Sequence, residues 1–146
     1  MPSDSSGFFD ALHPLTAKWF RKKFKRPTEA QELCVHRIRN RESVLLSSPT
    51  GSGKTLAGFL GVIDTLAREY YEGTLKTKAI RCLYVSPLRA LAYDIEKNLA
   101  GPLRDLGLDE VITVGLRTGD TSASERAKQR RKPPHILITT PESLAI

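Results

Sequence analysis

The stretch Ser48-Pro49-Thr50-Gly51-Ser52-Gly53-Lys54-Thr55 decides how the rest of the sequence is interpreted. It lies between a short apolar run, residues 43–47, and a segment with helical periodicity, residues 54–71. Glycine adopts backbone angles that other residues avoid, so Gly51 and Gly53 let successive N–H groups turn toward one anion. The N-terminus of the next helix adds partial positive charge. A strand, a glycine-rich turn and a helix in this order predict a phosphate-binding loop.

The loop's polar side chains have expected tasks in binding a nucleoside triphosphate. Lys54 reaches the β- and γ-phosphates, and the Thr55 hydroxyl is the expected Mg²⁺ ligand, so both are predicted catalytic residues. The expected nucleotide-binding residues of the loop are Thr50, Gly51, Ser52, Gly53, Lys54 and Thr55. Ser48 departs from the generic pattern, which begins with glycine. A turn followed by a chance Gly-Lys-Thr is the alternative, and the strand and helix on either side oppose it.

Strands and helices are predicted to alternate after this loop. Strands are expected at residues 43–47, 80–86, 111–116 and 135–140, and helices at 54–71, 88–106 and 122–131, with another opening at Pro141. Upstream, helices are expected at 15–24 and 29–39, the second capped by Thr28. The strands are continuous apolar runs, as is typical of strands buried on both faces. The pattern predicts an α/β fold: a parallel sheet covered by helices on both faces, with functional loops at the carboxyl ends of its strands.

Composition sets limits on the class of protein. The 146 residues are 40% hydrophobic and 27% charged, which excludes a wholly disordered chain. No apolar run approaches the roughly 18 to 20 residues that span a bilayer, and the polar N-terminus lacks the features of a signal peptide. Two cysteines, Cys34 and Cys82, are too few for a disulfide scaffold. A cytoplasmic location without membrane partners is therefore expected.

The formal net charge of +7 is unevenly distributed. Residues 1–45 carry +4, residues 46–116 are neutral, and residues 117–135 carry +4. Basic segments neutralise phosphates and release counterions when nucleic acid binds. The alternative is that both segments are ordinary solvated faces.

One part of a nucleotide-hydrolysing site is missing from the sequence. Hydrolysis requires carboxylates that hold Mg²⁺ and position water, normally at the end of a later strand. No apolar strand of this chain ends in Asp-Glu. Asp120 lies too far beyond the strand predicted at residues 111–116 to be such a carboxylate. Glu142 is separated by Thr-Thr-Pro from the apolar part of the strand predicted at residues 135–140.

Four further segments fall into order around the loop. They are Phe24-x-x-Pro27-Thr28-x-x-Gln31, Ser86-Pro87-Leu88-Arg89-Ala90-Leu91, Thr118-Gly119-Asp120 and Thr139-Thr140-Pro141-Glu142-Ser143-Leu144. Together with the loop they resemble the first motor domain of superfamily 2 (DEAD/DExH-box) helicases. The residues within each motif are most similar to those of the large helicase-related (Lhr) branch. The resemblance implies a RecA-like P-loop NTPase fold. It also implies a helical extension over residues 1–23, and over 24–146 a first RecA-like domain that stops before the Asp-Glu strand and is therefore incomplete.

The resemblance also implies roles for these segments. Gln31 would read the adenine of ATP, and Pro27 and Thr28 would shape its pocket; otherwise they are an exposed glutamine and an ordinary N-cap. The implied contacts to the backbone of single-stranded DNA or RNA are Pro87, Leu88, Arg89, Ala90, Thr118, Gly119, Asp120, Thr140, Pro141 and Glu142. ATP and Mg²⁺ are the implied cofactors, and a second RecA-like domain is the implied protein partner.

Three functions remain open from the sequence. The first is an ATP-dependent helicase or translocase motor, which as a fragment would not hydrolyse ATP alone. The second is a P-loop ATPase or kinase that does not act on nucleic acid, and the third is a non-catalytic nucleotide-binding module. The strand-end loops and basic flanks favour the first.

Overall fold

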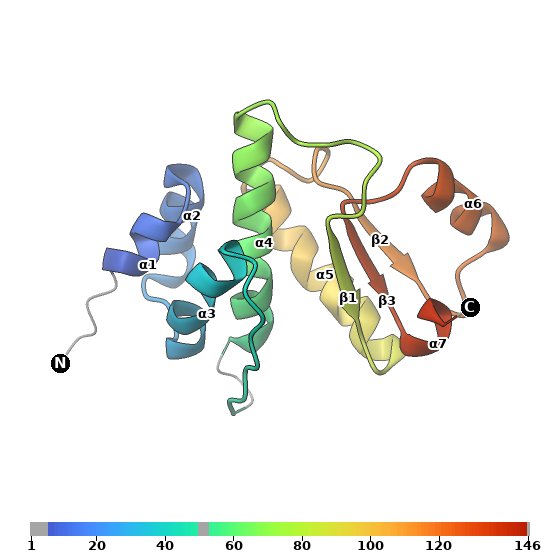
Figure 1. Cartoon of the computed structure of the whole chain (residues 1–146), viewed down its shortest axis with the longest axis horizontal. Coiled ribbons are helices and arrows are strands. Elements are labelled where there is room, and N and C mark those ends of the chain that lie inside the picture. The colour runs from blue at the N-terminus through green and yellow to red at the C-terminus, as the bar shows by residue number, and fades with distance from the viewer. Residues whose placement is uncertain (1–5, 50–52, 146) are drawn as a thin grey trace. The chain divides into compact units, whose positions relative to one another are not determined.

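The computed structural model describes residues 6–49 and 53–145, and the chain divides into two units, Met1–Gly73 and Thr74–Ile146. The first unit is helical, and the second contains a three-stranded parallel sheet (Figure 1). Among the residues in these described ranges, no helix has both the length and the apolar character needed to cross a membrane.

Four helices form the described part of the first unit: α1 (Ser6–Ala11), α2 (Pro14–Phe24), α3 (Glu29–Arg39) and α4 (Lys54–Tyr71). Proline at the first helical position suits α2, because that residue's N–H has no partner within the helix. The sequence predicted α2, α3 and α4, the last two with their observed bounds. It missed α1, a six-residue helix that contains a glycine.

Aromatic side chains join α1 to α2. The rings of Phe8 and Phe20 meet edge to face at 5.0 Å, and those of Trp19 and Phe24 at 5.9 Å. Phe20 is fully buried and Trp19 is 9% exposed, so both are packing residues. Such pairs stabilise beyond the area that they bury.

Small residues allow α3 and α4 to pack closely. Their core consists of Ala30, Cys34 and Ala57, with Ile38 and Leu46 packed against it. A Cβ atom on Gly61 would lie 2.8 Å from Cγ2 of Ile38, so this approach of the two helices requires glycine. Cys34 is a core residue, and the described residues contain no cluster of three or more side chains able to hold a metal.

A buried carboxylate ties α4 to the segments before it. Asp64, with no exposed surface, accepts a hydrogen bond from the His13 N–H at 2.8 Å and pairs with Arg68 at 2.9 Å and Arg39 at 3.7 Å. Both arginines also donate to the carbonyl of Ala11, at the end of α1. One side chain of α4 therefore organises the approach of α1, α2 and α3 to it.

The strand predicted at residues 43–47 is wrong. This segment is assigned no regular structure, and Leu45 is 96% exposed. An extended segment becomes a strand only when a neighbouring strand pairs with its N–H and C=O groups. The regular elements in the described part of the first unit are all helices, so residues 43–47 have no strand beside them within their own unit.

The sheet of the second unit has the order β1-β3-β2, from β1 (Cys82–Val85), β2 (Val114–Arg117) and β3 (Ile136–Thr139). All pairings are parallel, and Val85, Thr139 and Arg117 lie side by side in register. The three strands therefore end at one edge of the sheet, next to α7 (Pro141–Leu144) (Figure 1). The strand predicted at residues 111–116 is β2, which begins three residues later, at Val114. The N–H groups of Val111 and Ile112 instead donate to the Leu108 carbonyl in a turn.

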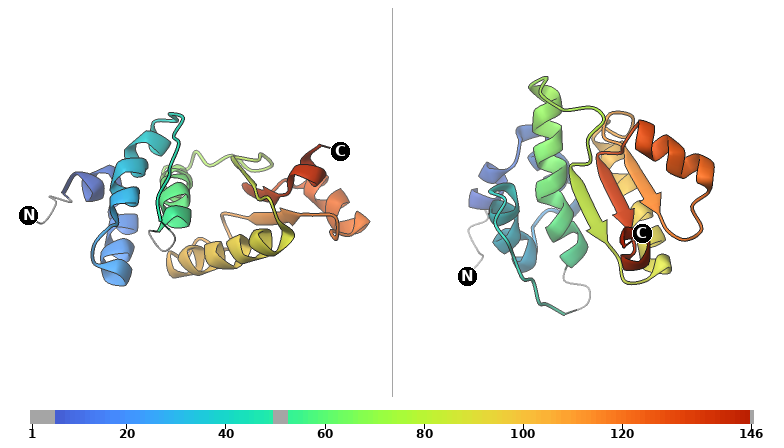
Figure 2. Two further views of the ribbon diagram at one scale, coloured as in Figure 1. Left: turned by 90° about the horizontal axis from the view of Figure 1, so that it is seen from below. Right: turned by 45° about the vertical axis from the view of Figure 1, so that its right-hand side comes forward.

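Helices flank the sheet, as predicted. The buried side of α5 (Arg89–Asp105) packs on one face (Figure 2). On the other face, Gln129 of α6 (Ala123–Arg131) lies beside Gly115 and donates to the Leu116 carbonyl at 3.0 Å. Leu83 and Val85 of β1, on that same face, remain 46% and 41% exposed, so the helix covers less of this face of the sheet than expected.

Burial raises the pKa of the Cys82 thiol, which is therefore neutral near pH 7.

Candidate nucleotide site and nucleic-acid interface

In the first unit, Thr28 and Gln31 form a reciprocal capping box at the start of α3. The Gln31 N–H donates to the Thr28 hydroxyl at 3.3 Å, and the Thr28 N–H donates to Oε1 of Gln31 at 2.9 Å. Gln31 is only 4% exposed, so it is not the exposed glutamine of the alternative interpretation. The N-cap interpretation of Thr28 is confirmed.

The capping box holds Gln31 against the glycine-rich loop. Gly53 has φ +77° in the left-handed region, and a Cβ atom on it would lie 2.7 Å from Nε2 of Gln31 and 3.3 Å from the Thr28 hydroxyl. Glycine is therefore required by both the backbone angle and the space. The predicted adenine-reading residue and the end of the predicted phosphate loop are direct neighbours.

Gly53 is also the N-cap of α4 and supplies no capping side chain. The first N–H groups of any α-helix lack intrahelical partners, and in this 18-residue helix no N-cap side chain accepts from them, which is the usual basis of an anion site. Lys54 and Thr55 open the helix, and both side chains are exposed. The Lys54 ammonium donates to the Ser48 carbonyl at 2.7 Å, so it spans the loop. Three predicted loop residues, Thr50, Gly51 and Ser52, lie outside the described residues, and Pro27 is half-buried beside Thr28.

Replacing Thr28 by alanine should lower the free energy of unfolding of the first unit by about 1 kcal/mol, because the N-cap hydroxyl is lost. Chemical denaturation followed by the fluorescence of Trp19, the single tryptophan, measures this unit. Exposed Ser47 supplies the control S47A, whose midpoint should not move. Equal midpoints for the two variants would show that the capping box contributes nothing to stability.

The second unit brings the other predicted segments together. Because the three strands end in register, the loops after Val85, Arg117 and Thr139 leave the sheet at the same edge. Residues of all three loops line one cleft of about 390 Å³. Its lining residues are Pro87, Leu88, Arg89, Gly119, Arg126, Thr140, Glu142 and Ser143.

Six of the ten predicted nucleic-acid contacts line this cleft, and four do not. Ala90 and Pro141 are exposed beside it, Asp120 forms an ion pair with Arg89, and Thr118 is fully buried. The Thr118 hydroxyl accepts the Asp120 N–H at 3.2 Å, so it shapes its own loop.

Arg126 and Ser143 also line the cleft. Arg126 belongs to the basic segment 126–132, which from the sequence could line this face or be a solvated helix end, whereas Ser143 was not expected to be a contact. Arg126 donates to the carbonyls of Thr121 at 3.1 Å and Thr118 at 2.9 Å and fastens the loop between them. The Thr140 hydroxyl donates to that of Ser143 at 3.3 Å and makes no capping bond to the backbone, so Thr140 is an N-cap by position only. The sequence signal for Arg126 was its place in a basic segment, and the signal for Ser143 was its place in the Thr-Pro-Glu-Ser motif.

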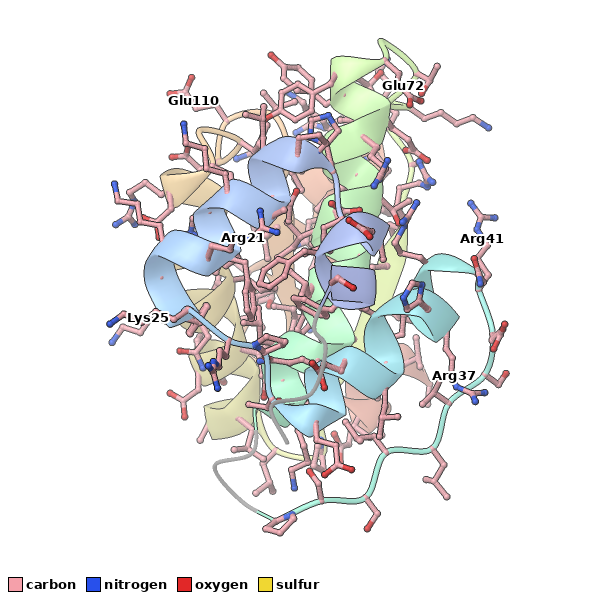
Figure 3. The ribbon with its side chains drawn as sticks, turned by 90° about the vertical axis from the view of Figure 1, so that its left-hand side faces the viewer. Arg21, Lys25, Arg37, Arg41, Glu72 and Glu110 are labelled. Carbon is pink, nitrogen blue, oxygen red and sulfur yellow. The ribbon has the colours of Figure 1, made fainter. Side chains whose placement is uncertain are left out.

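The basic segments are exposed in both units. Lys25 extends away from α2, and Arg37 and Arg41 extend from the end of α3 (Figure 3). Arg37 pairs with Glu42 at 3.6 Å in solvent, which is typical of a solvated face. Lys128, Arg130, Arg131 and Lys132 are likewise exposed, so charge alone does not separate the two interpretations.

The loop, the strand-end cleft and the parallel sheet are features of a helicase motor domain. Residues 28–146 match the model of the DEAD/DEAH box helicase family, and the chain belongs to that family. The resemblance inferred from the motifs is therefore confirmed.

The chain is similar to Lhr helicases over most of its length. It is 49% identical to the ATP-dependent helicase Lhr-Core of Methanothermobacter thermautotrophicus over 92% of this chain and 16% of the relative. It is 47% identical to the Lhr helicase/uracil glycosylase of Escherichia coli over 98% of this chain and 10% of the relative. The chain thus spans between a tenth and a sixth of these relatives.

Solved structures support the fold. The Mycobacterium smegmatis helicase Lhr, bound to ssDNA and AMP-PNP, superposes with a TM-score of 0.81 at 43% identity, over 91% of this chain and 17% of that one. The helicase MrfA, bound to DNA and AMPPNP, gives a TM-score of 0.76 at 28% identity, over 99% of this chain and 18% of that one. The predicted RecA-like architecture, here an incomplete domain, is confirmed.

Proposed function

We propose that this chain is the ATP-binding part of the first motor domain of an ATP-dependent helicase or translocase that acts on single-stranded DNA or RNA. The observation that carries the proposal is the convergence of three strand-end loops on one cleft lined by Arg89 and Arg126. Such a cleft suits an anionic backbone, and the relative from M. smegmatis is bound to ssDNA and AMP-PNP. Residues 24–146 are the proposed domain, and residues 1–23 its helical extension.

The described residues of the first unit fit ATP. Lys54, the N-terminus of α4 and Gln31 beside Gly53 offer a cation, free N–H donors and an amide within one short segment. Thr55 is the residue of this chain that would hold Mg²⁺, which would neutralise charge on the transferred phosphate when bound. Further carboxylates and arginines belong to the rest of the motor, including a second RecA-like domain. Because ATP and nucleic acid are both present in the cytoplasm, we place the protein there.

Titration of fluorescent oligo-dT and oligo-U into the full-length protein at increasing NaCl tests this function. Binding should weaken steeply with salt, and AMP-PNP should change the affinity by about fivefold or more. Poly-aspartate is the control, because it offers charge without a sugar-phosphate backbone. Salt-insensitive binding, or equal competition by poly-aspartate, would favour a P-loop ATPase that does not act on nucleic acid or a plain nucleotide-binding module.

A further inference from the structure

Arg89 is the first residue of α5 and stands in the wall of the strand-end cleft. Its Nη1 lies 2.8 Å from Oδ2 of Asp120, on the loop after β2, and both side chains are 58% exposed. The two residues are 31 positions apart in the sequence and come from different sheet-end loops. This ion pair is therefore a feature of the fold and not of a local helix turn.

Gly119 leaves the space that the guanidinium occupies. A Cβ atom on Gly119 would lie 3.3 Å from Nη2 of Arg89, with Cζ at 3.7 Å and Nε at 4.0 Å. Three atoms of the guanidinium thus lie across this backbone position. A methyl group at residue 119 would require Nη2 of Arg89 to shift by a few tenths of an ångström, and a larger side chain would take the space of the guanidinium.

The loop that carries Asp120 is held by several hydrogen bonds of its own. The Asp120 N–H donates to the Thr118 hydroxyl, the Thr118 N–H donates to the Thr121 hydroxyl at 2.9 Å, and Arg126 binds two carbonyls of the same turn. Arginine has many rotamers, and fixing one of them lowers the entropy that binding must remove. A carboxylate on one Nη, carried by this hydrogen-bonded loop, leaves other N–H donors of the planar guanidinium available.

We propose that Gly119 and Asp120 form a seat for Arg89, in which Asp120 is a positioning residue that aims the guanidinium at a phosphate of the bound strand. Asp120 itself does not line the cleft, whereas Arg89 and Gly119 do, so the carboxylate supports the arginine from outside the binding surface. This inference rests on the proposed function. It replaces the expectation that Asp120 contacts nucleic acid directly.

Binding of oligo-dT and oligo-U to the full-length protein, measured by anisotropy over a range of NaCl, tests the seat. R89A should bind about tenfold more weakly, and its salt slope should fall by about 0.7, the value for one lost contact with a single strand. D120N should bind about threefold more weakly, although it removes a negative charge near a polyanion. G119V should weaken binding similarly, because a branched side chain at this position would occupy the space of the guanidinium.

A double-mutant cycle separates positioning from plain electrostatics. In the R89A background, D120N should cause no further loss, since Asp120 acts only through Arg89. E125Q, on exposed Glu125 of α6, removes the same charge outside the seat and should leave affinity unchanged or slightly higher. Unchanged thermal unfolding of each variant establishes that the fold is intact.

Two results overturn the seat. One is tighter binding by D120N in both backgrounds, which would mean that the carboxylate competes with phosphate or repels it. The other is an additive loss in the double mutant. If R89A itself leaves affinity and salt slope unchanged, the proposed nucleic-acid role of the cleft fails as well, and the two failures are thereby distinguished.

Discussion

Replacing Lys54 by alanine should reduce ATP hydrolysis by the full-length protein at least about 100-fold. The ammonium stands at the first turn of α4, next to the left-handed Gly53 and 2.7 Å from the Ser48 carbonyl. In the transition state negative charge develops on the leaving β-phosphate oxygen as its bond to the γ-phosphorus breaks, and a fixed cation stabilises that charge more than it stabilises the bound substrate. Alanine keeps the helix but supplies neither charge nor donor.

This substitution should leave the fold unchanged, so the loss can be assigned to the site. The Lys54 side chain is exposed, and alanine is the best helix former. K97A, on an exposed position of α5, is the matched control and should hydrolyse ATP normally. Steady-state turnover at saturating nucleic acid measures the effect. Turnover of K54A within about twofold of the parent protein would contradict the assignment of the loop.

How much the sequence predicts depends on whether a feature is local. The bounds of α4 are local, because a glycine that tolerates φ > 0 precedes Lys54 and apolar residues recur at helical spacing after it. The meeting of the two loops that carry Arg89 and Gly119 follows from topology, since parallel strands carry their next loops to one edge. Both features could be predicted from the sequence.

Features that depend on a partner distant in the sequence could not be predicted. Residues 43–47 have the composition of a strand, but strand formation requires a neighbouring strand that the sequence pattern cannot locate. The ion pair between Arg89 and Asp120 and the burial of Asp64 also depend on side-chain placement. An aspartate in the middle of an amphipathic helix carries no signal that it faces inward.

Replacing Asp64 by alanine should lower the free energy of unfolding of the first unit by about 3 kcal/mol. The His13 N–H would lose its acceptor, and Arg39 and Arg68, each less than one-third exposed, would lose their counter-charge. Unpaired buried donors and cations are costly because neither water nor a carboxylate replaces the lost oxygen. The effect should exceed that of any surface ion pair of the chain.

Trp19 makes the measurement specific. It is the single tryptophan and belongs to the aromatic cluster between α1 and α2, so its fluorescence follows the unit that Asp64 holds together. D64N keeps one acceptor oxygen without the charge and should fall between the parent and D64A. E72Q, at exposed Glu72 just after α4, removes the same charge and should stay within about 0.5 kcal/mol of the parent (Figure 3).

The sign of the result separates tertiary organisation from helix propensity. Alanine is a better helix former than aspartate, so D64A taken as a change in α4 alone should be stabilising. A large destabilisation can therefore come only from the contacts to His13, Arg39 and Arg68. A midpoint for D64A at or above that of E72Q would mean that these contacts add nothing, and that the aromatic cluster alone holds α1 and α2 in place.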